Sequence, residues 1–122
     1  MQFNFNSAEP LYLQVAEQIM EAILAKIYSA DDQIPSTTEI SRSYHINPAT
    51  VLKGMNLLVN QGLIVKKRGI GMFVTPHAYQ KIVEQRRDQF YQQRITDLIK
   101  EARRLQISKD ELISLIERGF NE

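Results

Sequence analysis

The sequence has no cysteine, only two histidines and no long hydrophobic run. Without cysteine there is no disulfide, no thiolate nucleophile and no zinc site of the cysteine type. Neither His45 nor His77 has a second histidine or a carboxylate at ligand spacing nearby, so we expect no metal and no cofactor. The least polar stretch, residues 19–28, contains Glu21 and Lys26 and is far shorter than the roughly 20 apolar residues of a membrane span.

Signatures of the common enzyme classes are missing as well. The chain shows no phosphate-binding loop, no Ser-His-Asp order and no paired carboxylates in a glycine-bounded cleft, so it is not expected to be an enzyme. Its 122 residues fit one ordinary soluble domain with a small appendage. The first six residues lack the positive charge and apolar core of a signal peptide, which predicts a cytoplasmic protein.

The net charge is only +1, but the charges are unevenly distributed along the chain. Residues 1–35 carry five acidic side chains and one basic side chain, whereas residues 36–76 carry five basic side chains and one acidic side chain. The middle segment is therefore net +4 and the first segment net −4. A basic face of this kind favours a polyanion as the partner.

Capping residues predict two helices in the first 45 residues. Pro10 suits a first helical turn, and the apolar side chains after it recur at nearly one helical turn, which predicts a helix over about 10–28. A polar run then predicts a connecting loop up to residue 35, with Ile34 as a short apolar anchor. Ser36 and Glu39 have the capping-box arrangement, which predicts a short helix over about 36–44.

A third helix and a hairpin follow. Asn47 is a preferred N-cap and Pro48 fits the first helical position, so a helix is expected over about 48–60, with its aliphatic side chains in the core. Gly62 stands where a left-handed cap residue belongs. Residues 63–65 and 72–74 are β-prone, and the segment between them, Lys66-Lys67-Arg68-Gly69-Ile70-Gly71, predicts the basic tip of a hairpin.

The remaining residues predict two helices. Residues 78–105 contain no proline or glycine, and their apolar side chains alternate at spacings of four and three, which is typical of a heptad seam. Ser108 and Glu111 predict a second capping box that opens a last helix. The expected fold is therefore mainly α with a small β-hairpin, a winged helix-turn-helix over 1–76 followed by a helical tail over 77–122.

Two short helices separated by a tight turn are typical of a helix-turn-helix, whose second helix enters the major groove of DNA. The exposed start of the third helix then carries the base readers, and their chemistry fits: Asn pairs with adenine, Thr and Ala contact thymine methyls, and Lys reaches guanine or phosphate. The basic hairpin tip would probe the minor groove or the backbone beside it. The Ser36 hydroxyl, at a helix N-terminus, would donate to a phosphate.

Each of these features also has a purely structural interpretation. Ser36 and Asn47 could serve only as caps, Thr50 and Lys53 could be solvated helix surface, and charged hairpin tips are common in proteins that bind nothing there. A protein-interaction scaffold that uses a winged fold without DNA is the competing function. It would show an uncharged or acidic third helix and wing, and the +4 middle segment argues against it.

Five short segments carry a resemblance to a known family. They are Pro10-Leu11-Tyr12-Leu13-Gln14-Val15, Ile34-Pro35-Ser36, Ile46-Asn47-Pro48-Ala49-Thr50-Val51, Gly62-Leu63-Ile64 and Arg68-Gly69-Ile70-Gly71-Met72-Phe73-Val74. Over about residues 9–75 the chain resembles the N-terminal domain of GntR-type transcription regulators, and its Asn-Pro-x-Thr-Val form and short tail resemble the YtrA-type subgroup. The resemblance implies a small repressor, often of an ABC-transporter operon, whose two C-terminal helices mediate dimerisation.

The resemblance also assigns residues. It implies base contacts from the start of the third helix, a wing contact from Arg68 and Gly69, and backbone contacts from Tyr12 and Ser36. Thr38 stands where the family has the arginine of Pro-Ser-x-Arg, which removes one DNA-contacting cation. The candidate DNA-binding residues are Tyr12, Ser36, Thr37, Thr38, Asn47, Ala49, Thr50, Lys53, Lys67, Arg68 and Gly69.

A homodimer on a palindromic operator is expected, because a single winged module would bury little DNA surface and the apolar seam of the tail needs a partner. The candidate dimerisation residues are Tyr91, Ile95, Leu98, Ala102, Leu105, Leu112 and Ile116. No membrane partner is expected. The sequence does not indicate a small-molecule effector, and leaves open only a ligand at the dimer interface near Tyr79, Arg86, Arg87 or Tyr91.

Overall fold

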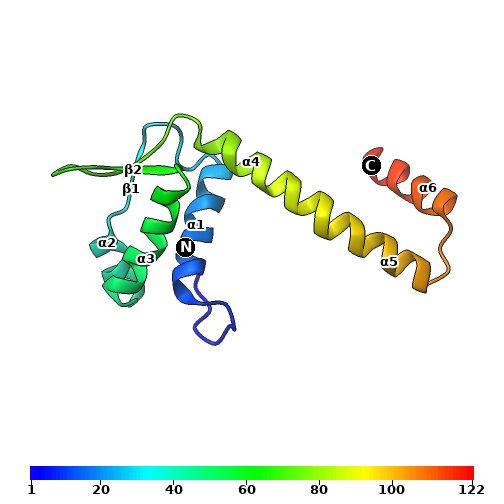
Figure 1. Cartoon of the computed structure of the whole chain (residues 1–122), viewed down its shortest axis with the longest axis horizontal. Helices are drawn as coiled ribbons and strands as arrows, with labels where there is room; N and C mark the ends of the chain where they lie inside the picture. Colours follow the sequence, from blue (N-terminus) through cyan, green and yellow to red (C-terminus); the bar gives the residue numbers. More distant parts are fainter. The chain divides into compact units, whose positions relative to one another are not determined.

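A computed structural model describes all 122 residues, and the chain is mostly helical with one small antiparallel sheet (Figure 1). The expected fold class is confirmed. The chain divides into two compact units, Met1–Glu84 and Gln85–Glu122. None of the helices combines the length and the apolar character needed to cross a lipid bilayer.

The first unit contains α1 (Leu11–Leu24), α2 (Thr37–Tyr44), α3 (Pro48–Asn60) and the first residues of α4 (Ala78–Gln89). The first helix is shorter than predicted, because the chain leaves it at a left-handed residue, Lys26, with φ 59°. The amide of Ile27 donates to the carbonyl of Ala22 at 2.9 Å, which is the closing bond of a Schellman-type helix end. Ile27 continues the apolar spacing but is 68% exposed.

Both predicted caps of the helix-turn-helix are confirmed. The amide of Glu39 donates to Ser36 Oγ at 3.0 Å and the amide of Ser36 donates to Glu39 Oε1 at 3.3 Å, which completes the capping box of α2. At the start of α3 the amide of Ala49 donates to Asn47 Oδ1 at 2.8 Å. Between the two helices His45 adopts a left-handed conformation, with φ 56°, and turns the chain.

The sheet has three strands, β1 (Gln33–Ile34), β2 (Ile64–Lys67) and β3 (Gly71–Val74), in the order β1-β3-β2. The prediction of only a loop before residue 35 was wrong, because Gln33 and Ile34 pair with Phe73 and Met72 of β3. The predicted hairpin is confirmed, but its basic tip is shorter than expected. Lys66 and Lys67 belong to β2, since Lys67 pairs with Gly71, and the turn consists of residues 68–70 alone.

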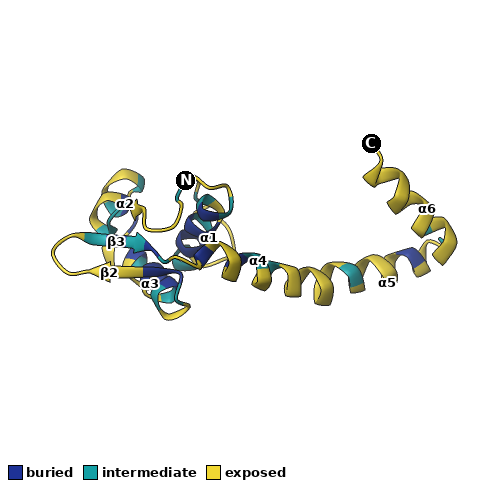
Figure 2. Ribbon diagram, turned by 90° about the horizontal axis from the view of Figure 1, so that it is seen from above, coloured by how far each residue is buried: buried dark blue, intermediate teal, exposed yellow.

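The core of the first unit lies between α1, α3 and the sheet, and Figure 2 shows the buried faces turned inward. Val51, Met55 and Leu58 of α3 are buried as predicted. Leu52 is not, since 47% of it is exposed, so the expectation that all the aliphatic residues of this helix lie in the core was wrong. Ala78 and Ile82, at the start of α4, are fully buried in this same core.

The second unit contains the end of α4, a π-helical segment η1 (Phe90–Ile95), α5 (Thr96–Arg104) and α6 (Lys109–Phe120). A regular helix over 78–105 was predicted, but η1 interrupts the α-helical hydrogen bonding. A π turn bonds residues five apart rather than four, so the seam predicted from heptad spacing shifts its phase there. The predicted capping box of α6 is present in its first half: the amide of Glu111 donates to Ser108 Oγ at 3.1 Å, which makes Ser108 the N-cap.

Candidate nucleic-acid interface

The start of α3 presents the four predicted base readers on the outside of the first unit. Asn47, Ala49 and Lys53 are exposed and Thr50 is partly buried, while Val51 and Met55 on the opposite side are fully buried. Residues three and four positions apart lie on one helix face, so Ala49, Thr50 and Lys53 form one strip. This strip is free of acidic side chains and carries one cation. It offers a methyl, a hydroxyl and an ammonium group to the edges of base pairs, and Asn47 beside it adds an amide.

Tyr12 lies against this strip, although it is 41 positions from Lys53 in the sequence. The ammonium nitrogen of Lys53 lies 4.0 Å from the centre of the Tyr12 ring. The reason is a close crossing of α1 and α3 at Gly54: a Cβ atom on this buried glycine would lie 2.6 Å from the carbonyl oxygen of Tyr12. Sequence reasoning missed Gly54, and the signal available was an isolated glycine inside a helical pattern.

The N-terminus of α2 carries three more predicted contact residues. Thr38 is exposed, and Ser36 and Thr37 are partly exposed. In the capping box the Ser36 hydroxyl accepts a hydrogen bond from the amide of Glu39, and its own O–H remains able to donate. A helix N-terminus favours an anion through its amides and dipole, so a DNA phosphate suits this position.

The wing, residues 64–74, carries Lys67, Arg68 and Gly69 at its exposed end. The ammonium nitrogen of Lys67 lies 4.4 Å from the centre of the Phe73 ring on the neighbouring strand. Gly69 has φ 77°, and nothing lies within 4 Å of where its Cβ would stand, so the tip can approach a sugar-phosphate wall closely. In Figures 1 and 2 the wing tip and α2 lie toward the same end of the first unit.

The strand β1, which sequence reasoning missed, braces this wing tip. Gln33 Nε2 donates to the carbonyl oxygen of Ile70 at 2.9 Å. Gly71 makes room for that amide, because a Cβ at Gly71 would lie 2.5 Å from Gln33 Nε2. The tip is therefore held by a third strand as well as by its own hairpin.

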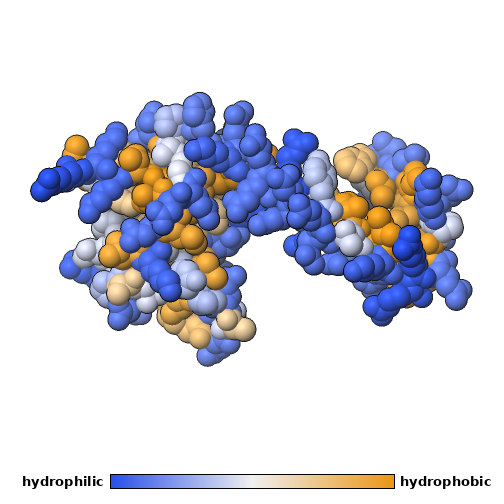
Figure 3. Space-filling view, viewed as in Figure 1, coloured by the Kyte–Doolittle hydropathy of each residue, from blue (hydrophilic) through white to orange (hydrophobic).

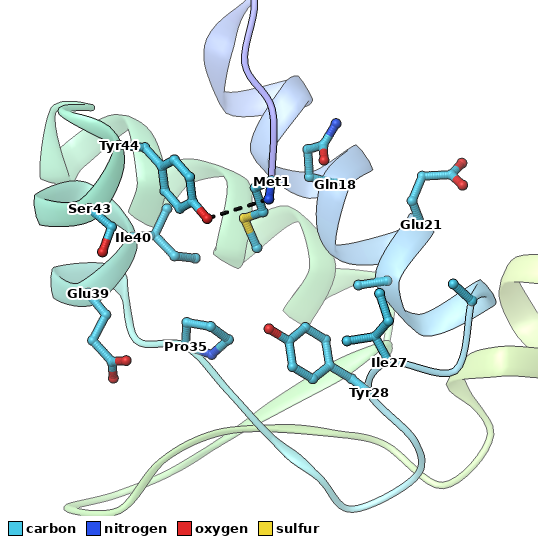
Figure 4. A pocket seen from close by; sticks show the side chains of 12 residues that line it. Met1, Gln18, Glu21, Ile27, Tyr28, Pro35, Glu39, Ile40, Ser43 and Tyr44 are labelled. Atoms are coloured by element: carbon cyan, nitrogen blue, oxygen red, sulfur yellow. Dashed lines mark hydrogen bonds between the residues drawn. The ribbon is translucent and has the colours of Figure 1, made fainter.

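A hollow of about 490 Å³ lies on the first unit between α1 and α2 (Figure 4). Tyr28, Tyr44 and Glu39 are among the residues that line it, and the amino group of Met1 donates to the Tyr44 hydroxyl at 3.4 Å. Burial, followed by the proximity of Tyr44 and Glu39, raises the pKa of Tyr28. Of the predicted DNA-binding residues, none lines this hollow.

The second unit carries an apolar groove of about 470 Å³ between α5 and α6, visible as the hydrophobic surface over these helices in Figure 3. Five of the predicted dimerisation residues line it, namely Ile95, Leu98, Ala102, Leu112 and Ile116. Tyr91 and Leu105 do not, and they are 54% and 62% exposed. Of the residues named for an effector, Tyr79 lies in the first unit, whereas Tyr91 of the second unit accepts a hydrogen bond from Arg87 at 3.2 Å.

A family model matches most of the first unit. The model described as bacterial regulatory proteins, gntR family, covers residues 11–74. The HTH-type transcriptional repressor YtrA of Bacillus subtilis is 32% identical to this chain over 84 residues, which are 69% of this chain and 65% of that repressor. The similarity thus extends beyond the wing and into the region of α4.

Two solved structures extend the comparison. A GntR-family crystal structure from Bacteroides thetaiotaomicron has a TM-score of 0.74 and 32% identity, and the match covers 91% of this chain and 96% of that one. The DNA-binding domain of AraR in complex with operator ORX1 has a TM-score of 0.56 and 30% identity, and the match covers 62% of this chain and 93% of that one. The first match includes the tail, and the second is confined to a DNA-binding domain.

Proposed function

The chain belongs to the gntR family of bacterial regulatory proteins, and from this membership we propose that it binds a palindromic operator as a homodimer and represses transcription by occluding a promoter. The family makes it a YtrA-like DNA-binding transcription regulator rather than an enzyme. The dimer, the palindrome and the identity of the controlled genes are the parts that the proposal adds.

The exposed strip of α3 carries the proposal for the DNA contacts. In this assignment α3 enters the major groove, where Asn47, Ala49, Thr50 and Lys53 meet the base edges. Arg68 and Gly69 of the wing meet the minor groove or the backbone, and the N-terminus of α2 meets a phosphate. The operator complex of the AraR DNA-binding domain, which resembles residues of this first unit, supports double-stranded DNA as the ligand.

The apolar groove of the second unit supports the proposed dimer. Nine large hydrophobic side chains of this unit are at least 41% exposed, namely Phe90, Tyr91, Leu98, Ile99, Leu105, Ile113, Leu115, Ile116 and Phe120. An exposed apolar face of this kind marks a protein interface, and a second copy of the same tail offers a matching face. Two recognition helices would then be held one helical turn of DNA apart, roughly 34–36 Å, or a multiple of it.

The proposal extends to the regulated genes and the place of action. The resemblance to YtrA-type repressors implies control of an ABC-transporter operon, and we assign this chain that kind of target, with the cytoplasm as its place of action. An effector is not part of the proposal. Once the operator is known, the genes that it controls will indicate which signal releases the protein from DNA.

Selection of bound DNA tests these points together. The full chain is incubated with a pool of random duplexes at two salt concentrations, and the retained DNA is sequenced. A palindrome is expected, with affinity falling as salt rises because neutralised phosphates release counterions. Thr50→Ala and Lys53→Ala should each weaken both half-sites by about 1–3 kcal/mol if they remove base contacts. No enrichment, or retention insensitive to salt, would favour an interaction scaffold.

A further inference from the structure

Tyr12 contacts the strip of Ala49, Thr50 and Lys53 through the face of its ring. A hydrogen bond from its hydroxyl to a DNA phosphate would not require this placement of the ring. Its ring, rather than its hydroxyl, faces Lys53, with 4.0 Å between the ammonium nitrogen and the ring centre. We infer that Tyr12 is a positioning residue for DNA binding: its ring holds the Lys53 ammonium in place on the α3 strip, and its hydroxyl is dispensable for DNA binding. This inference rests on the proposed DNA-binding function of α3.

The packing of the first unit fixes the ring in this place. Tyr12 is the second residue of α1, and it is partly buried. Gly54, next to Lys53 in α3, lets the backbone of α3 approach α1 so closely that a Cβ atom would lie 2.6 Å from the Tyr12 carbonyl oxygen and 3.1 Å from Val15. Val15 is itself fully buried. The relative position of ring and lysine therefore depends on two packed helices and not on a flexible loop.

The contact changes what Lys53 can do. Lysine has a long flexible stem, and an ammonium group free to rotate must lose much of that freedom when it binds a base or phosphate. A cation over a ring face is held by the ring quadrupole and keeps its N–H groups for other acceptors. Lys53 is exposed, so a DNA acceptor can approach it while Tyr12 stays in place. The ring thus restricts the lysine before DNA arrives.

Two variants separate ring from hydroxyl. Tyr12→Phe keeps the ring and should keep the affinity for the selected palindrome within about twofold, whereas Tyr12→Leu should weaken it about twofold to fivefold, the range expected for an exposed cation–π contact. Both variants are checked by thermal unfolding, and affinities are compared only if both remain folded. If Tyr12→Phe loses as much as Tyr12→Leu, the hydroxyl is what binds, and the inference is overturned.

A double-mutant cycle with Lys53→Met, which keeps most of the apolar stem, tests whether Tyr12 acts through Lys53. In the Lys53→Met background Tyr12→Leu should have no further effect on affinity. Equal losses in both backgrounds would show that Tyr12 acts independently, again against the inference. The free protein gives a second readout: the Lys53 Cε protons should show an upfield ring-current shift in the wild type and Tyr12→Phe, lost in Tyr12→Leu.

The outcomes distinguish this inference from the proposed function. Binding of the wild-type chain to a palindrome, weakened by Lys53→Met, supports the function whatever Tyr12 does. Absent coupling in that case rejects only the positioning role. If the wild-type chain retains no duplex, the proposed function fails and the inference falls with it.

Discussion

The two units of the chain differ in how much of their apolar surface they bury by themselves. The first unit, Met1–Glu84, contains every buried hydrophobic residue of the chain except one. The second unit, Gln85–Glu122, contains only Ala102 of that set, at 6% exposure, and it leaves nine large hydrophobic side chains exposed. Apolar burial is the main favourable term in folding. The first unit therefore completes its own core, whereas the second unit needs another protein surface to cover its apolar side chains.

The largest expected effect tests the self-sufficiency of the first unit. Ile19 of α1 is fully buried in the core of the first unit. Ile19→Ala should therefore lower the free energy of unfolding by about 2–5 kcal/mol, because apolar burial is lost and a cavity remains. Urea unfolding of the full chain, followed by far-UV circular dichroism, measures it. Ile27→Ala is the matched control: it removes the same atoms from a side chain 68% exposed. If the two variants lost equal amounts of unfolding free energy, the buried core would not be what stabilises the first unit.

The next effect tests the second unit. Ile116 lines the apolar groove, and Ile116→Glu would put a charge into the proposed dimer interface. We expect the dimer dissociation constant to rise about a hundredfold, or ~2.8 kcal/mol, as measured by sedimentation equilibrium over a concentration series.

Ser114→Glu provides the control for this variant. It adds the same charge to the same helix at an exposed position that does not line the groove, two residues from Ile116 and therefore on another helix face, and it should leave the association unchanged. A wild-type chain that stays monomeric at tens of micromolar, or an Ile116→Glu variant that associates normally, would reject the interface.

Sequence reasoning succeeded where the determinants are local. The capping box of Ser36 and Glu39, the cap at Asn47 and the left-handed Gly62, with φ 73°, each depend on a few neighbouring residues, and each was predicted. The end of α1 was missed because Ile27 continues the apolar spacing while the backbone turns at Lys26. Apolar periodicity alone does not report where the backbone stops being helical.

The misses of longer range have a tertiary cause. Strand β1 has only two residues, and its assignment depends on pairing with β3, about 40 residues later. The contact between Tyr12 and Lys53 depends on how closely α1 and α3 cross at Gly54, which spacing along one helix does not encode. In the second unit the π segment shifts the phase of the seam, so a heptad count through residues 90–95 included Tyr91, which does not line the groove.

A pair of equivalent caps sharpens the comparison of the two units. Ser36 and Ser108 both accept a hydrogen bond from the amide three residues later, and loss of such a cap costs about 1 kcal/mol. Ser36→Ala should lower the global unfolding free energy of the first unit by that amount. Ser108→Ala should instead speed amide hydrogen exchange in α6 and leave the first unit's unfolding unchanged.

Hydrogen exchange followed by mass spectrometry on both variants separates these outcomes. The contrast arises because α2 is tied through Ile40 to the core, whereas no residue of α6 is buried. A global loss from Ser108→Ala equal to that from Ser36→Ala would mean that the two units unfold together. The difference in burial would then have no counterpart in local stability.

The smallest expected effect concerns Thr38, which is exposed in the first turn of α2 and stands where the resemblance to GntR-type regulators predicts arginine. Thr38→Arg should tighten binding of the selected palindrome about threefold and steepen its salt dependence by about 0.9 per added phosphate contact. Thr38→Gln adds length without charge and should do neither. Because Thr38 belongs to the self-contained unit, the gain should persist in the Ile116→Glu background on a single half-site. If the affinity increased only for the dimer, the arginine would instead act through the spacing of the two copies.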